Sequence, residues 1–371
     1  MPTVEQVMEV LATVEDPEIH KPITELGMVD EVVIDGGTVG VRIKLTIPGC
    51  PLKDRITGDV TGAVQTLEGV DDVQVHFGSM TEDERKNLSS SLRSQAGSAN
   101  PGLEIPFAGA DSQTKVIAVA SGKGGVGKSS VTVNLAASLA KQGFSVGVLD
   151  ADIWGYSIPR MMGVDGKPVA FEGMVMPLQA HGCKVISIGF FTDPDRSVLW
   201  RGPMLHRALQ QFLGDVYWGE LDFLLCDLPP GTGDIAISLA QMLPDADMLV
   251  ITTPQQAAQK VAERAGKATE QTGMNVIGVI ENMATFICPD CDTPHDLFGS
   301  GGGQELAEAL DTELLGRIPI DVRLREGSDA GMPLVLSDPD SPAAVAIDDV
   351  AKGLARSKTS IVGRKLPLAI G

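Results

Sequence analysis

The 371-residue sequence has few aromatic and few basic residues. Phe, Trp and Tyr make up 4% of the chain, whereas Gly occurs 42 times, which favours an α/β enzyme with many tight turns over an aromatic-rich binding surface. Lys and Arg number 29 against 49 Asp and Glu, for a formal net charge of −20. A protein of that charge repels phosphate backbones and anionic lipids, so the composition disfavours binding to nucleic acid or to a membrane surface.

Cysteines and long apolar runs are also scarce. Five cysteines in a chain of this length do not make a disulfide framework. No apolar run approaches the roughly 20 residues that a membrane-spanning helix needs. Residues 1–16 are acidic, where a secretion signal would be basic. We therefore expect a cytoplasmic protein in a reducing environment, with neither a membrane nor a nucleic-acid partner.

The first third of the chain has the pattern of a small domain followed by a linker. Helical spacing at 4–14 and 52–67 and alternating strands at 32–34, 39–46 and 73–77 predict an α+β domain over residues 1–77. Residues 78–114 are rich in Ser, Gly and Pro, and we expect a linker there. Thr81 and Glu84 have the spacing of a capping box, which indicates a short helix inside it.

Strands and helices alternate from residue 115 to residue 356. This alternation predicts a mostly parallel sheet with helices on both faces. Residues 357–371 are basic, and we expect a mobile tail. The expected strands are 115–120, 145–150, 184–188, 223–227, 248–252 and 275–281, and the clearest helices are 129–142, 203–212 and 255–272.

Residues 122–129 match the phosphate-binding pattern G-x-x-x-x-G-K-[ST] in full. The motif follows a buried strand and opens a helix. Its glycines let backbone N–H groups face the phosphates, and the positive end of the helix adds to that field. Lys128 is expected to reach the β- and γ-phosphates and Ser129 to bind Mg²⁺. The predicted nucleotide-binding residues are Gly122, Lys123, Gly124, Gly125, Val126, Gly127, Lys128, Ser129 and Ser130.

A second site is indicated by Cys288-Pro289-Asp290-Cys291. Two thiolates at this spacing can share a zinc ion or an iron–sulfur cluster. A four-iron cluster usually needs four thiolates, and because the sequence has no second such pair, a symmetric dimer would have to supply the others. His295 offers the alternative of a zinc site with three ligands from one chain. A redox-active pair is less favoured. The spacing leaves the cluster and zinc as open alternatives.

The phosphate loop has an additional lysine, Lys123, and resembles the deviant Walker A loop of the MinD, ParA and nitrogenase iron-protein class. The resemblance implies a dimer in which Lys123 reaches the nucleotide of the partner subunit. It implies that Asp152 orients the attacking water, that Asp150 holds a Mg²⁺-bound water and that Asp227 ends the Walker B strand. It further implies that Asn282 contacts the adenine base. The catalytic residues implied are Lys123, Lys128, Asp152 and Asp227.

The combined motifs resemble the Mrp/ApbC family of iron–sulfur cluster carrier ATPases. They occupy residues 121–129, 150–159, 227–234, 281–283, 288–291 and 318–321. The resemblance favours an iron–sulfur cluster over zinc at Cys288 and Cys291. It implies an ATP-hydrolysing homodimer that binds a 4Fe-4S cluster between its subunits, receives it from a scaffold or donor protein and transfers it to apo-proteins.

The N-terminal domain resembles a small PaaD-like iron–sulfur assembly domain. Residues 16–19, 26–29 and 46–51 carry this resemblance. Cys50 within them is a candidate for transient contact with a cluster or a target, and a buried turn thiol fits the same position equally well.

Two other functions are alternatives to the carrier. A MinD/ParA-type spatial organiser with a structural zinc site would need a basic surface or an amphipathic anchor. The basic stretch 352–365 contains Gly353 and Gly363 and has a poor apolar stripe. A nitrogenase-type electron donor would carry single cysteines after two different strands, and the sequence lacks them there.

Overall fold

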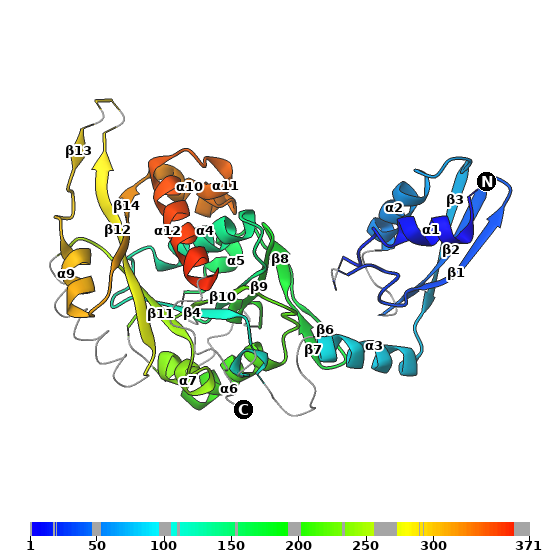
Figure 1. Cartoon of the computed structure of the whole chain (residues 1–371), viewed down its shortest axis with the longest axis horizontal. Coiled ribbons are helices and arrows are strands. Elements are labelled where there is room, and N and C mark those ends of the chain that lie inside the picture. The colour runs from blue at the N-terminus through cyan, green and yellow to red at the C-terminus, as the bar shows by residue number, and fades with distance from the viewer. Residues whose placement is uncertain are drawn as a thin grey trace, which may run out of the picture. The chain divides into compact units, whose positions relative to one another are not determined.

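The computed structural model describes residues 2–17, 19, 21–46, 53–95, 105–109, 112–152, 155–191, 202–231, 234–255, 273–288, 290–291 and 293–359. The chain divides into two compact units (Figure 1). One unit comprises Met1–Ala99 with Val169–Met176, and the other comprises Asn100–Pro168 with Pro177–Gly371. Cys50, the predicted helix beyond Gln255 and the predicted tail beyond residue 359 lie outside the described residues.

The first unit is built on a three-stranded sheet of order β1-β2-β3. β1 and β2 form an antiparallel hairpin that turns at Gly36, which has a φ of 59°. β2 and β3 run parallel, because helix α2 connects them as a crossover. Its elements are α1 (Val4–Leu11), β1 (Val29–Asp35), β2 (Thr38–Leu45), α2 (Lys53–Val64), β3 (Asp72–Ser79) and α3 (Glu82–Gln95).

Helix α3 lies within the stretch expected to be a linker. Its capping box is present: the Thr81 N–H donates to Glu84 Oε2 at 2.8 Å, and the Glu84 N–H donates to Thr81 Oγ1 at 3.3 Å. The unit also includes a hairpin of β6 (Val169–Phe171) and β7 (Met174–Met176), which the sequence pattern did not predict. Arg85 Nε of α3 lies 3.8 Å from Glu172 Oε1 at the turn of that hairpin.

The second unit has a nine-stranded sheet of order β13-β12-β11-β4-β10-β5-β9-β8, with β14 also paired to β12. The pairs β12–β13 and β8–β9 are antiparallel and the others are parallel. Its strands are β4 (Lys115–Ala120), β5 (Val146–Asp150), β8 (Leu178–Ala180), β9 (Cys183–Ser187), β10 (Phe223–Asp227), β11 (Asp247–Thr252), β12 (Asn275–Ile287), β13 (Pro294–His295) and β14 (Leu314–Ile320).

Helices cover this sheet, which confirms the predicted fold class. They are α4 (Lys128–Lys141), α5 (Ile158–Met161), α6 (Gly202–Gly214), α7 (Asp234–Met242), α9 (Gly302–Ala309), α10 (Val322–Ala330), α11 (Leu334–Ser337) and α12 (Pro342–Thr359), with 3-10 turns at Pro106–Ala108 and Ile188–Phe191. Ser138 of α4 donates to Asp348 of α12 at 2.6 Å beside the apolar core that these helices form with the sheet. In the described part of the chain no helix has the length and apolarity to cross a membrane.

The register of the central strands brings two acidic residues to one level. β10 pairs with β5 so that Asp227 lies opposite Asp150, and β10 pairs with β4 so that Asp227 lies opposite Val119. All three strands run in the same direction, so their carboxyl ends lie at one edge of the sheet. Ligand sites of open α/β sheets form at that edge.

Candidate nucleotide site and cysteine hairpin

The loop between β4 and α4 curls around the start of the helix. Gly125 and Gly127 have φ values of 77° and 80°, a left-handed conformation that favours glycine. Gly127 is the N-cap of α4, and a Cβ on it would collide with Nδ2 of Asn282. A cavity of about 220 Å³ opens in front of the loop, and Asp152 and Pro230 line its other sides.

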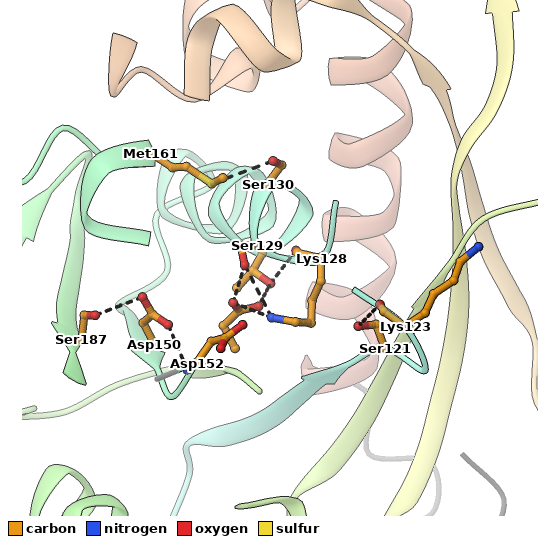
Figure 2. A network of polar contacts seen from close by, with 11 residues as sticks. Ser121, Lys123, Lys128, Ser129, Ser130, Asp150, Asp152, Met161 and Ser187 are labelled. Atoms are coloured by element: carbon orange, nitrogen blue, oxygen red, sulfur yellow. Dashed lines mark hydrogen bonds and ion pairs between the residues drawn. The ribbon is translucent and has the colours of Figure 1, made fainter. Parts of the chain in front are cut away.

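The Lys128 ammonium is buried within the site and paired with an acid. Its Nζ lies 2.6 Å from Asp227 Oδ2, and the two side chains are 6% and 0% exposed. Ser129 Oγ donates to the same Asp227 oxygen at 2.6 Å. Figure 2 shows Lys128 and Ser129 converging from the first turn of α4. Thr132, one turn further along, donates from Oγ1 to Asp227 Oδ1 at 2.9 Å. Thr132 was not among the residues predicted from the sequence, although its i+4 spacing from Lys128 places it on the same helix face.

Asp150 is buried beside this group. Ser187 Oγ donates to Asp150 Oδ2 at 3.0 Å, and the Asp152 N–H donates to Asp150 Oδ1 at 3.2 Å (Figure 2). Burial, and then the charge of Asp227, raise the pKa of Asp150 to about 8. Both effects penalise a second negative charge in this place. A divalent cation would reverse that preference, and the hydroxyl and carboxylate oxygens present are the donors that Mg²⁺ accepts.

Lys123 points away from the cavity (Figure 2). Its Nζ donates to Gln255 Oε1 at 2.6 Å. Only its backbone follows the loop, where its carbonyl oxygen accepts a hydrogen bond from Ser121 Oγ at 3.1 Å. In this conformation the Lys123 ammonium lies away from its own phosphate site, so the predicted action on a partner's nucleotide stays a prediction.

Ser130 and Asn282 have different contacts near the loop. Ser130 lines the cavity, and its hydroxyl donates to Met161 Sδ at 3.8 Å. Asn282 is 2% exposed, and its Nδ2 donates to the backbone oxygen of Val126 at 2.8 Å. The structure therefore places Asn282 against the phosphate loop itself. Its predicted contact with the adenine base stays a prediction.

The cysteine pair lies at the end of the β12–β13 hairpin, which extends beyond the rest of the sheet in Figure 1. The Cys288 N–H donates to the Thr293 carbonyl oxygen at 3.1 Å, and Cys291 Sγ lies 3.2 Å from Thr293 Oγ1. Hydrogen bonding of the Cys291 thiol with the Thr293 side chain, the Thr293 backbone and the Cys288 thiol lowers the pKa of Cys291. Cys291 is exposed and Cys288 half-buried. An accessible thiol with a lowered pKa forms the thiolate that metals bind.

The other two cysteines that the structure describes, Cys183 and Cys226, are buried. Burial raises the pKa of Cys183 to about 12. Burial, together with the charge of Asp227, raises the pKa of Cys226 as well. These two thiols are core residues, and neither lies in the hairpin.

The zinc alternative required a third ligand from the same chain. His295 lies in β13, opposite Phe286, and is exposed. Among the residues that the structure describes, no three His, Cys, Asp or Glu side chains are grouped so that they could hold a metal ion. A single-chain site of two cysteines and His295 is therefore not assembled.

Two family models match the chain. The model of the NUBPL iron-transfer P-loop NTPase matches residues 112–355, and that of an iron–sulfur cluster assembly protein matches residues 4–77. A Mycobacterium tuberculosis protein named "Iron-sulfur cluster carrier protein" is 52% identical over 365 residues, which cover 96% of this chain and 94% of its own length. A protein of the same name from Synechocystis sp. is 43% identical over 362 residues, covering 96% and 98%.

Solved structures include one that is similar in both sequence and fold. It is a nucleotide-binding protein from Archaeoglobus fulgidus in complex with ADP, 42% identical, with a TM-score of 0.54. The match covers 62% of this chain and 90% of the archaeal one.

Proposed function

The chain belongs to the family of NUBPL-type iron-transfer P-loop NTPases, and we propose that it is an ATP-hydrolysing carrier of iron–sulfur clusters. The resemblance that the sequence motifs indicated is confirmed by the family models and by near full-length relatives named as carriers. The finer proposal is that a labile 4Fe-4S cluster binds between two copies of the chain and passes to apo-proteins.

The geometry of the phosphate loop supports ATP binding. The β- and γ-phosphates would fill the cavity in front of the N-terminus of α4, where backbone N–H groups and the helix dipole favour anions. Lys128 would then leave Asp227 Oδ2 and direct its ammonium to the phosphates. Asp227 would keep its hydrogen bond from Thr132, which holds the carboxylate in place during this exchange.

Hydrolysis adds roles for four residues. Ser129 would hold Mg²⁺ directly and Asp150 would hold it through water, and the ion would neutralise developing charge on the phosphates. Asp152 lines the cavity and would orient the attacking water. Lys123 of the partner subunit would complete the site, after release from Gln255.

The observation that carries the cluster proposal is the arrangement of Cys288 and Cys291. Their thiols hydrogen-bond to one another at the end of an exposed hairpin, and the described residues add no third ligand. Two such pairs related by a two-fold axis would provide the four thiolates that a 4Fe-4S cluster usually takes. A cluster held in this way would be exposed, which suits a carrier that must release it.

The proposed activity implies two kinds of partner protein. A scaffold or donor protein would load the cluster, and apo-proteins would receive it.

We propose that residues 1–77 form an assembly-like domain, that 78–114 connect it, that 115–356 form the ATPase domain and that 357–371 form a tail. The family-model matches to residues 4–77 and 112–355 support two separate modules.

Anaerobic reconstitution with iron and sulfide tests the proposal. Purified protein should gain broad absorbance at about 400 nm and bind about four irons per dimer. Cys288→Ala and Cys291→Ala should each lose the cluster and keep their circular dichroism spectra. Cys183→Ala is the matched control, because that thiol is buried away from the hairpin, and it should retain the cluster. Zinc at one per chain with no bound iron would contradict the cluster proposal.

A further inference from the structure

Strand β12 reaches from the nucleotide site to the cysteine pair, and it changes its partners on the way. Residues 275–281 pair with β11, ending at Thr252↔Glu281, and residues 279–286 pair with β14. Beyond Glu281, Phe286 and Ile287 pair with β13 in the hairpin that carries the cysteines. Asn282 and Cys288 are six residues apart in the chain.

A bulge separates these two parts of β12. Asn282 pairs with Ile318 and Phe286 pairs with Ile320, so β12 advances four residues while β14 advances two. Met283, the first residue of the bulge, has a φ of 56°. A residue with a Cβ adopts this left-handed conformation only where its surroundings impose it, and such positions concentrate at functional sites. Bulges also redirect side chains next to active sites.

The bulge lies against the phosphate loop. Asn282 Nδ2 donates to the Val126 carbonyl oxygen at 2.8 Å. On the other side of the same peptide bond, a Cβ on Gly127 would lie 3.8 Å from Met283 Cε. The peptide that joins Val126 to Gly127 belongs to the segment whose N–H groups must turn toward the phosphates. Asn282, at the start of the bulge, therefore contacts a peptide that nucleotide binding acts on, and the end of the Met283 side chain lies near it.

Reorientation of this peptide would act on Asn282. If phosphates turn the Val126–Gly127 peptide, its carbonyl oxygen turns with it. Asn282 is 2% exposed, so its N–H cannot exchange that acceptor for bulk water and would lose a hydrogen bond in a buried place. The favourable response is for Asn282 to move with the loop or to take a new acceptor, and either response displaces the bulge.

We propose that the Asn282–Met283 corner of β12 couples the phosphate loop to the cysteine hairpin, with Asn282 as the positioning residue. Nucleotide occupancy changes the bulge, and the bulge changes how Cys288 and Cys291 are presented. This coupling rests on the proposed function, which identifies the phosphate loop as an ATP site and the cysteine hairpin as a cluster site. It is reciprocal, because any ligand of the thiols must alter nucleotide affinity by the same factor.

Thiol reactivity in the protein without a cluster tests the coupling directly. The parent is the full chain with Cys50→Ser, and the buried Cys183 and Cys226 do not compete for the alkylating reagent. ADP or a non-hydrolysable ATP analogue, each with Mg²⁺, should change the alkylation rate of the hairpin thiols about fivefold or more. In Asn282→Ala the change should fall below about twofold at a nucleotide concentration that saturates the variant.

Two further variants keep the test decisive. Met283→Gly preserves the left-handed turn and removes the side chain at the loop, so it should fold and also weaken the response. Asn275→Ala is the matched control, since Asn275 lies at the other end of β12, where its Nδ2 contacts Asp247 Oδ1 at 3.3 Å. It should respond like the parent. If Asn282→Ala does not fold or does not bind nucleotide, the response of Met283→Gly decides.

Failure of this coupling is distinguishable from failure of the carrier proposal. A full nucleotide response in both Asn282→Ala and Met283→Gly, or no response in the parent, overturns the coupling, whatever the cluster content. A chain that binds no cluster on reconstitution contradicts the carrier proposal, yet a thiol response that these variants abolish would still support the coupling.

Discussion

Replacement of Lys128 by Ala would remove an ammonium group that the fold has buried 2.6 Å from Asp227 Oδ2. Loss of one partner from a buried ion pair costs about 3–5 kcal/mol, because the other charge stays in a place that water cannot reach. Asp227 would keep hydrogen bonds from Ser129 and Thr132, which stabilise its carboxylate. We therefore expect a loss near the lower end, about 3 kcal/mol of the free energy of unfolding.

This loss should appear in thermal unfolding of the protein without nucleotide. For a unit of this size, 1 kcal/mol lowers Tm by about 2–4 °C, so Lys128→Ala should unfold about 6–12 °C below the parent. The same variant should hydrolyse no ATP, because no ammonium remains for the β- and γ-phosphates. Circular dichroism and phosphate release measure the two effects on one preparation.

A second substitution separates stability from activity. In the double variant Lys128→Ala, Asp227→Asn, the buried charge is removed along with its partner, so much of the lost Tm should return while hydrolysis stays absent. A single variant that unfolds at the parental temperature would refute the argument from the buried pair. A double variant that hydrolyses ATP would refute the role of Lys128 at the phosphates.

Three further predictions concern other parts of the chain. Lys123→Ala should retain a measurable fraction of ATP binding but lose most turnover, because its proposed target is the nucleotide of the partner subunit; parental turnover would contradict this. A chain that begins at Thr114 should fold, dimerise and hydrolyse ATP, which gel filtration and phosphate release would check, and insoluble protein would count against an independent ATPase domain. The hydrogen bond from Lys44, with those from Thr81, lowers the pKa of Glu84 from 4.5 to about 2. The stability that the Glu84 carboxylate contributes is therefore complete above pH 4.5 and is lost as the pH falls through about 2. Glu84→Gln should therefore speed amide hydrogen exchange in α3 at pH 7, with a difference from the parent that shrinks below pH 4.5; a difference independent of pH would exclude this cause.

The sequence predicted the elements whose signals are local. The apolar runs at 115–120 and 223–227 coincide with β4 and β10, because a strand buried on both faces of a parallel sheet must be apolar throughout. The phosphate loop was predictable for a similar reason, since the glycines and Lys128 act through the backbone of one continuous segment. The expected strand at 275–281 was too short, because β12 continues past a bulge to Ile287.

The tertiary structure decided which distant side chains meet. Contacts of Asn282 with Val126, of Lys123 with Gln255 and of Ser187 with Asp150 join positions that no periodicity relates. Such pairs depend on strand order and register, which follow from the packing of the whole sheet. By itself the sequence determined the nucleotide motif, the cysteine spacing and the family. Burial of Asp150 beside Asp227, with its raised pKa, and the contact of β12 with the phosphate loop arose only when the chain folded, because desolvation and proximity are properties of the packed structure.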